Sequence, residues 1–286
     1  MEKLTSPRTI EGLLKKYDLH FNKRFGQNFL IDGNMVEKIV AAGQLTKADV
    51  VLEVGPGIGT MTQVLAREAG KVYAVEIDKK LIPVLEETLA DCPNVSVICG
   101  DILKTDVAAL VAEELAQGMS LKIVANLPYY VTTPIIMGFL ESDLPVERMS
   151  FLIQKEVGER ICAQPGTKAY GSLTIACQYY VQPQVAFYVP AGVFMPRPKV
   201  DSVVITLEKR QAPSVNPGDK ELFFRIVKAA FLNRRKTLIN SLCANTGYDK
   251  ERLIGALEAA HIDPGVRAER LTGEDFARLS DCLQKE

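Results

Sequence analysis

The sequence predicts a doubly wound α/β domain with a largely parallel sheet, followed by a small domain built from helices. Short runs rich in β-branched residues alternate with amphipathic stretches up to residue 126, and this alternation is typical of βαβ units. A glycine-rich turn follows the first of these runs, and from residue 220 the apolar periodicity is helical. With 286 residues, 47% of them hydrophobic, the chain can bury one full-sized core and a second, smaller one.

The expected sheet begins with four short apolar runs, as strands buried on both faces of a parallel sheet require. These runs are 50–54, 71–77, 95–99 and 121–126. The stretches between them carry apolar residues at three- and four-residue spacing, which predicts helices at 61–69, 79–90 and 107–118. Further strand candidates are 149–154, 184–190 and 202–208, with a helical stretch at 172–180. The sheet domain is therefore expected to cover residues 1–208.

The chain changes character after the last strand candidate. Residues 209–219 contain two prolines, a glycine and few apolar side chains, which predicts a linker. Residues 220–286 contain helical periodicity and no strand candidate. A small helical domain is expected there.

Composition narrows the functional classes. The net charge is −1, so any nucleic-acid surface must come from local clusters. The six cysteines include no C-x-x-C pair and stand beside only two histidines, so no zinc-site spacing is present. Reduced thiols indicate the cytosol, and no segment approaches the roughly 20 apolar residues of a membrane span. We expect a cytoplasmic protein with neither a metal centre nor a membrane segment.

The turn "EVGPGIGT", residues 53–60, is the first site candidate. Its three glycines let a ligand approach the main chain without meeting a Cβ atom. No G-K-[ST] follows, which excludes a P-loop, and the third glycine comes one residue too early for a dinucleotide motif. The spacing suits a nucleoside without a pyrophosphate. A plain strand-to-helix turn that binds nothing is the alternative.

Two carboxylates follow at successive strand ends. Glu76 comes 21 residues after Gly55, close to the spacing of an acidic residue that accepts from ribose hydroxyls. Asp101 follows the third strand, where its side chain could meet an adenine edge. Singly, these residues could be a helix cap and a turn former. Together they favour a cofactor that contains adenosine.

The order of "EVGPGIG", "VEID", "GD" and "NLPYY" resembles that of class I S-adenosylmethionine-dependent methyltransferases. The chain is more closely similar to the bacterial ribosomal RNA adenine N6-dimethyltransferases, and the resemblance covers nearly its whole length. The supporting motifs are "KRFGQNFL" (23–30), "NLPYYVTTPI" (126–135), "VFMPRPKVDS" (193–202) and "AAFLNRRKTL" (229–238). The resemblance implies a Rossmann-like class I methyltransferase sheet with a smaller all-helical C-terminal domain.

The resemblance also implies S-adenosylmethionine as the cofactor. The residues that would contact it are Asn28, Leu30, Gly55, Gly57, Glu76, Ile77, Asp101, Ile102 and Asn126.

The "NLPYY" segment has the parts that an adenine methyltransferase needs. The amine of adenine is a poor nucleophile, and two acceptors would help it: the side-chain oxygen of Asn126 and a backbone carbonyl of Leu127 or Pro128. Pro128 would also stiffen the loop, and Tyr129 would stack on the target base. Alternatively, the segment is a turn whose tyrosines pack on a helix.

Phe194 lies between an apolar strand and two prolines, which suggests an exposed ring. The resemblance implies that this ring faces Tyr129 across a flipped adenine. An ordinary core phenylalanine is the alternative.

Two basic groups are candidates for RNA contacts. Lys23 and Arg24 stand beside Phe25, a mixture that can hold a backbone and stack bases. The second group is Arg234, Arg235 and Lys236 in the helical domain. Arg197 is a further candidate. Solvated helix faces are the alternative for the last three.

The main functional hypothesis is an enzyme that dimethylates two adjacent adenosines near the 3′ end of small-subunit (16S) ribosomal RNA. Its partners would be the small ribosomal subunit and its RNA, and we expect a monomer. A large-subunit enzyme of the antibiotic-resistance type is one alternative. A non-catalytic RNA-binding factor that retains the fold is the other.

Overall fold

The computed structural model describes residues 4–19 and 27–284. Two compact units are present. The sheet unit extends to Gly158 and resumes over Gln184–Lys209, and the helical unit comprises Glu159–Pro183 and the chain from Arg210 onward. The second unit therefore takes residues 159–183, which the sequence interpretation placed in the first domain.

The reason lies in α9 (Ser172–Tyr180), whose aromatic residues pack within the helical unit. The Tyr179 ring centroid lies 5.9 Å from that of Phe223 and 5.1 Å from that of Phe224. Contacts between residues so far apart in the sequence decide to which unit a helix belongs. Local periodicity does not reveal them.

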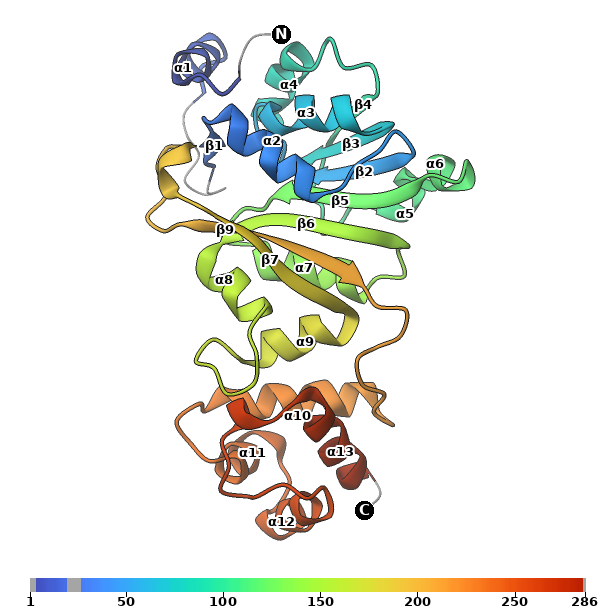
Figure 1. Cartoon of the computed structure of the whole chain (residues 1–286), viewed down its shortest axis with the longest axis vertical. Coiled ribbons are helices and arrows are strands. Elements are labelled where there is room, and N and C mark those ends of the chain that lie inside the picture. The colour runs from blue at the N-terminus through green and yellow to red at the C-terminus, as the bar shows by residue number, and fades with distance from the viewer. Residues whose placement is uncertain (1–3, 20–26, 285–286) are drawn as a thin grey trace. The chain divides into compact units, whose positions relative to one another are not determined.

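The described residues form a seven-stranded sheet with the order β4-β3-β2-β5-β6-β9-β7 (Figure 1). Its strands are β2 (Asp49–Val54), β3 (Lys71–Glu76), β4 (Val95–Cys99), β5 (Ser120–Asn126), β6 (Val146–Gln154), β7 (Val181–Val189) and β9 (Ser202–Lys209). The first five pair in parallel, and β9 runs antiparallel to β6. The predicted α/β fold is confirmed. Because β2 to β5 are parallel, their carboxyl ends meet at one edge of the sheet.

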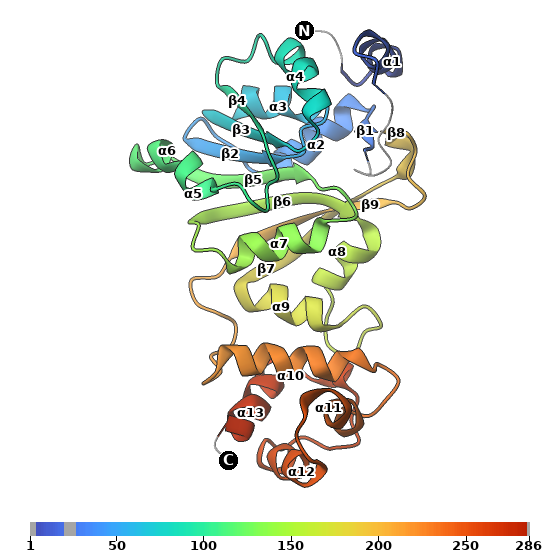
Figure 2. The same ribbon diagram turned by 180° about the vertical axis from the view of Figure 1, so that it is seen from behind.

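Helices cover both faces of this sheet. The helices of the sheet unit are α1 (Pro7–Lys16), α2 (Gly33–Ala42), α3 (Thr60–Glu68), α4 (Ile82–Thr88), α5 (Val107–Leu110), α6 (Ala112–Ala116) and α7 (Thr132–Glu141). Helix α8 (Lys155–Ile161) crosses the boundary between the units. Figure 1 shows α2 and α3 on one face, and Figure 2 shows α7 in front of the other. Val36, Ile39, Val51 and Leu65 form the core under α2 and α3.

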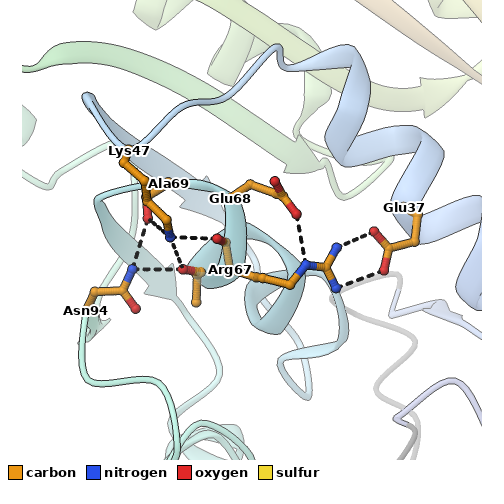
Figure 3. Close-up of polar contacts among 7 residues, drawn as sticks. Glu37, Lys47, Arg67, Glu68, Ala69 and Asn94 are labelled. Atoms are coloured by element: carbon orange, nitrogen blue, oxygen red, sulfur yellow. Dashed lines mark hydrogen bonds and ion pairs between the residues drawn. The ribbon is translucent and has the colours of Figure 1, made fainter.

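The carboxyl end of α3 is held by two side chains from neighbouring loops (Figure 3). Lys47 Nζ donates to the carbonyls of Arg67 at 2.6 Å and Ala69 at 3.0 Å. Asn94 Nδ2 donates to the carbonyls of Ala66 at 2.9 Å, Ala69 at 3.1 Å and Gly70 at 3.3 Å. The last carbonyls of a helix have no partner inside the helix, so these bonds fix the far end of α3 and keep its amino end at the glycine-rich turn.

The helical unit has a core of its own. Besides α9 it contains α10 (Lys220–Leu232), α11 (Leu238–Thr246), α12 (Lys250–Ala259) and α13 (Gly273–Gln284). Phe223, Leu242, Leu253 and Phe276 are almost fully buried among them. Asp219 caps α10 by accepting from Leu222 N, as expected of an aspartate at a helix amino end.

A small two-stranded sheet joins distant parts of the sheet unit. In it β1 (Phe29–Leu30) pairs antiparallel with β8 (Phe194–Met195), which follows a short 3₁₀ turn at Ala191–Val193. Ile31 N also donates to the Val193 carbonyl at 2.9 Å. The segment around Asn28 is thereby fixed beside the edge where the parallel strands end.

Candidate active site

A cavity lies at the carboxyl ends of β2, β3, β4 and β5. Its wall is built from segment 27–30, the turn after β2, residues 75–77, residues 100–103 and the loop after β5. All the residues predicted to contact a cofactor line it: Asn28, Leu30, Gly55, Gly57, Glu76, Ile77, Asp101, Ile102 and Asn126. The structure thus brings these residues together, and their role in binding stays a prediction.

The turn between β2 and α3 depends on glycine. Gly55 has φ 69° and Gly57 has φ 63°, in the left-handed region that other residues avoid. A Cβ atom at Gly57 would also lie 3.0 Å from the Phe29 ring, a contact tighter than side chains normally make. At these two glycines the turn therefore presents backbone atoms, and no side chain, to the cavity.

Glu76 is held rigidly at the end of β3. It is 4% exposed, and its carboxylate accepts from Gly57 N at 3.2 Å and Asp78 N at 2.8 Å. Burial raises the pKa of Glu76 to about 7, although these backbone donors oppose the shift. A carboxylate fixed in this way beside a cavity can accept hydrogen bonds from a pair of ribose hydroxyls.

Glu53 is a cavity residue that the sequence interpretation did not single out. It is 1% exposed, lies on β2 and lines the cavity. Neither carboxyl oxygen has a hydrogen-bond partner among the described residues. Burial raises the pKa of Glu53 to about 8, with a smaller contribution from the negative charge of Glu76, although the nearby Thr62 hydroxyl opposes the shift. The signal in the sequence is a single acidic residue within the otherwise apolar run "VVLEV".

Asp101 shapes the wall beyond β4. Its Oδ1 accepts from Leu103 N at 3.1 Å, and its carbonyl accepts from Lys104 N at 2.9 Å and Thr105 N at 3.0 Å. These bonds close a tight turn that places Ile102 and Leu103 on the wall of the cavity. Asp101 is thus both a turn former and a cavity residue, so the two interpretations of the sequence are compatible.

The loop after β5 presents amide and aromatic groups at the cavity. Asn126 Nδ2 lies 3.4 Å from the Asn28 carbonyl, which orients the amide. Leu127 is 1% exposed and its N–H donates to the Leu152 carbonyl at 3.0 Å. The Pro128 carbonyl already accepts from Val131 N at 3.2 Å and Thr132 Oγ1 at 2.9 Å.

Tyr129 is anchored at its hydroxyl. The hydroxyls of Tyr129 and Ser202 lie 2.8 Å apart and share a hydrogen bond. Burial raises the pKa of Tyr129. Tyr129 thus lines the cavity while its hydroxyl is fixed to the first residue of β9.

The expectation that Phe194 is exposed is wrong. Its ring is 3% exposed and belongs to a core with Val36, Val189 and Val204. Pairing of β8 with β1 turns the ring inward, and the prolines at 196 and 198 extend only the chain that follows it. A role for Phe194 in the reaction stays a prediction, and exposure of its ring no longer supports it.

The candidate RNA contacts are distributed over the chain. Lys23, Arg24 and Phe25 lie outside the described residues. Arg197 is exposed in the sheet unit, and Arg234, Arg235 and Lys236 are exposed in the helical unit. Arg234 also donates to the carbonyls of Lys168 at 2.7 Å and Tyr170 at 3.1 Å, which gives it a structural role.

Membrane spans and metal clusters are both absent from residues 4–19 and 27–284. No helix there is long and apolar enough to cross a membrane. No cluster of three or more His, Cys, Asp or Glu side chains there could hold a metal ion.

Comparison with known proteins finds relatives that match the chain over its whole length. "Ribosomal RNA small subunit methyltransferase A" of Ligilactobacillus salivarius (strain UCC118) is 47% identical over 288 residues, covering 100% of this chain and 97% of the relative. The protein of the same name from Alkaliphilus metalliredigens (strain QYMF) is 49% identical over 281 residues, covering 98% of each chain.

Solved structures show the same fold. A dimethyladenosine transferase from Plasmodium falciparum has a TM-score of 0.73 at 24% identity, over 88% of this chain and 95% of that one. The 23S rRNA methyltransferase ErmE has a TM-score of 0.67 at 26% identity, over 90% of this chain and 99% of that one. Residues 18–285 match the family described as ribosomal RNA adenine dimethylase. The chain therefore belongs to the ribosomal RNA adenine dimethylase family.

Proposed function

We propose that this protein uses S-adenosylmethionine to place two methyl groups on the N6 atom of each of two adjacent adenosines near the 3′ end of small-subunit (16S) ribosomal RNA. The observation that carries the proposal is the position of the loop Asn126–Tyr130 on the wall of the cavity. One residue, Asn126, is shared between the predicted cofactor contacts and the predicted acceptors for the amine. The full-length relatives named for the small subunit support the choice of RNA.

The residues of the cavity fit the cofactor. Glu76 would accept from the ribose hydroxyls, the wall near Asp101 and Ile102 would hold the adenine, and the glycine-rich turn would receive the methionine end. When bound, the cofactor supplies a methyl group on a positively charged sulfur, which is an excellent leaving group. The fit rests on Gly57, where a Cβ atom would crowd Phe29, and on the rigid carboxylate of Glu76.

The chain's own contribution to transfer is a pair of hydrogen-bond acceptors. With Asn126 Nδ2 turned toward the Asn28 carbonyl, its Oδ1 is the atom left to accept from the adenine amine. The Pro128 carbonyl already accepts two hydrogen bonds, which favours the Leu127 carbonyl as the second acceptor. These bonds strengthen as the nitrogen becomes pyramidal, and so they stabilise the transition state more than the ground state.

Tyr129 and the basic residues would position the RNA. The Tyr129 ring offers a stacking surface for the extruded base, since an amine within a helix is hard to reach. The exposed Arg235 and Lys236 would contact phosphates from the helical unit. The proposal retains the expectation of a cytoplasmic monomer.

Two other functions remain as outcomes of the test. A large-subunit enzyme is suggested by the similarity to the 23S rRNA methyltransferase ErmE, although its identity of 26% is well below the 47% and 49% of the small-subunit relatives. A non-catalytic RNA-binding factor would keep the fold, but it would have no need for the complete set of Asn126, Tyr129, Glu76 and Asp101.

The test is methyl transfer from labelled S-adenosylmethionine to separated small and large subunits that lack adenine methylation, followed by nucleoside mass analysis. Dimethyladenosine confined to small-subunit RNA is expected. Asn126→Ala should lower the transfer rate by roughly 10²–10³ and weaken cofactor binding. Label in large-subunit RNA alone would favour the second function, and cofactor binding without any transfer would favour the third. Near-normal turnover by Asn126→Ala would contradict the acceptor role.

A further inference from the structure

An exposed pair of a cation and an aromatic ring lies on the sheet unit outside the cavity. Lys155 directly follows β6, and Tyr188 is the next-to-last residue of β7, the outermost strand of the sheet (Figure 1). The Lys155 Nζ lies 5.2 Å from the centre of the Tyr188 ring. Both residues are exposed, Tyr188 by 52%. An ammonium beside an exposed ring combines the two groups that hold a single nucleic-acid strand, one through phosphate and the other through a base.

Backbone pairing connects this pair to the anchor of Tyr129. Gln154, the last residue of β6, pairs in the sheet with Ser202, whose hydroxyl is bonded to that of Tyr129 at 2.8 Å. Lys155 N then donates to the Asp201 carbonyl at 3.0 Å. Lys155 therefore leaves β6 beside the residue that fixes Tyr129, and Tyr188 is brought to the same place. A strand whose base enters the cavity can continue onto this pair.

The fold holds the pair in position. Side chains alternate between the two faces of a strand, and the neighbours of Tyr188, Phe187 and Val189, pack in the core under α2 and α3. The Tyr188 ring therefore lies on the opposite face. The Lys155 side chain already lies over this ring, so it loses less conformational freedom when it contacts a phosphate.

We propose that Lys155 and Tyr188 bind the RNA nucleotides next to the extruded adenosine, with the ammonium on a phosphate and the exposed part of the ring under a base. This inference rests on the proposed function, because it requires the target adenosine in the cavity. Lys155 and Tyr188 are positioning residues, since they fix the path of the strand beside Tyr129 and do not touch the reacting atoms. They stand far apart in the sequence, so no cluster is visible there.

The experiment is filter binding of the full chain to unmethylated small subunits over a range of salt concentrations, with S-adenosylhomocysteine present. Lys155→Ala should reduce the slope of log affinity against log salt by about 0.7–0.9, the loss of one phosphate contact. Tyr188→Ala should lower the affinity by about 5- to 150-fold and leave the slope unchanged, because stacking releases no counterions. Tyr188→Phe, which keeps the ring, should restore most of the affinity.

The chain offers a matched control in a second pair of this kind. Lys71 Nζ lies 5.0 Å from the centre of the Tyr73 ring, but Lys71 begins β3 and so lies at the edge of the sheet opposite the cavity. Lys71→Ala should leave both the affinity and the slope unchanged. All variants should keep the circular dichroism spectrum and the cofactor affinity of the unaltered protein.

An unchanged slope in Lys155→Ala, or an unchanged affinity in Tyr188→Ala, would overturn the inference. Ultraviolet crosslinking of the unaltered protein needs no variant that must fold, and Tyr188 should crosslink to nucleotides beside the adenosine pair. A crosslink from Tyr188 to a distant part of the RNA would also overturn the inference. Failure of the unaltered protein to methylate small subunits would overturn the proposed function itself, which separates that failure from a failure of this contact alone.

Discussion

We expect Tyr129 to make two separable contributions, because the residue lines the cavity and its hydroxyl is bonded to Ser202. The hydroxyl pair lies at 2.8 Å and includes a serine with no exposed surface. Loss of the tyrosine hydroxyl would leave Ser202 without this partner but would keep the aromatic face.

We therefore expect Tyr129→Ala to lose more activity than Tyr129→Phe. Stacking on the target base contributes roughly 1–3 kcal/mol, so the alanine variant should lower kcat/KM for ribosomal RNA by about 5- to 150-fold. Tyr129→Phe should stay within about tenfold of the unaltered protein, the cost of one neutral hydrogen bond. Steady-state kinetics on unmethylated small subunits would measure both, and an equal loss in the two variants would refute the stacking role.

Single residues also show where interpretation of the sequence reaches its limit. Glu76 and Asp101 are identifiable because their place at strand ends is a local property of the chain. The neighbours of Phe194 predict an exposed ring, whereas its burial depends on pairing with Leu30, more than 160 residues earlier. Glu53 carries a visible signal, an acid inside an apolar strand, but its lack of partners is a property of the folded state.

At the scale of elements, the position of α3 depends on the carbonyl contacts at its far end. Asn94 donates to three carbonyls, whereas the nearby pair of Arg67 and Glu37 is exposed by half or more on both sides. Buried or partly buried hydrogen bonds contribute more to stability than solvated ion pairs.

Asn94→Ala should therefore lower the free energy of unfolding by about 1–2 kcal/mol. Glu37→Ala, a change on α2 that removes the exposed ion pair with Arg67 of α3, should cost less than about 1 kcal/mol. Urea denaturation monitored by circular dichroism would compare the two. A larger cost for Glu37→Ala would show that the ion pair, and not the carbonyl contacts, holds α3.

The strands and helices around the site are largely predictable from the sequence, because each has its own apolar periodicity. The parallel arrangement of the strands follows from the alternation of strands with helices. The small sheet of β1 and β8 is not, since two residues carry no periodic signal. The membership of α9 in the helical unit also escapes prediction, because aromatic contacts with Phe223 and Phe224 decide it.

At the scale of the whole molecule, the net charge of −1 means that RNA affinity must come from local groups. Arg234 is engaged with two carbonyls, which separates it from its neighbours Arg235 and Lys236. The three residues of one basic run therefore have different expected roles.

A double variant, Arg235→Ala with Lys236→Ala, should weaken binding to small-subunit RNA and reduce its salt dependence. The slope should fall by about one logarithmic unit for each phosphate that the variant no longer neutralises. Arg278→Ala, a change at another exposed arginine of the helical unit, should leave the slope unchanged. Filter binding over a range of salt concentrations would measure both. An unchanged slope in the double variant would indicate that these side chains are only solvated.

Glu53, Glu76 and Asp101 make the described wall of the cavity acidic, and this has a consequence for competition among metabolites. Adenosine is also the common part of ATP and NAD, whose phosphates require cations or a cradle of free backbone N–H groups. Here one of the turn's N–H groups, that of Gly57, is already committed to Glu76, and the described wall presents acids to any phosphate that enters. We therefore expect the phosphates of ATP and NAD to lower the affinity of these nucleotides for the cavity relative to that of an adenosine cofactor without phosphates.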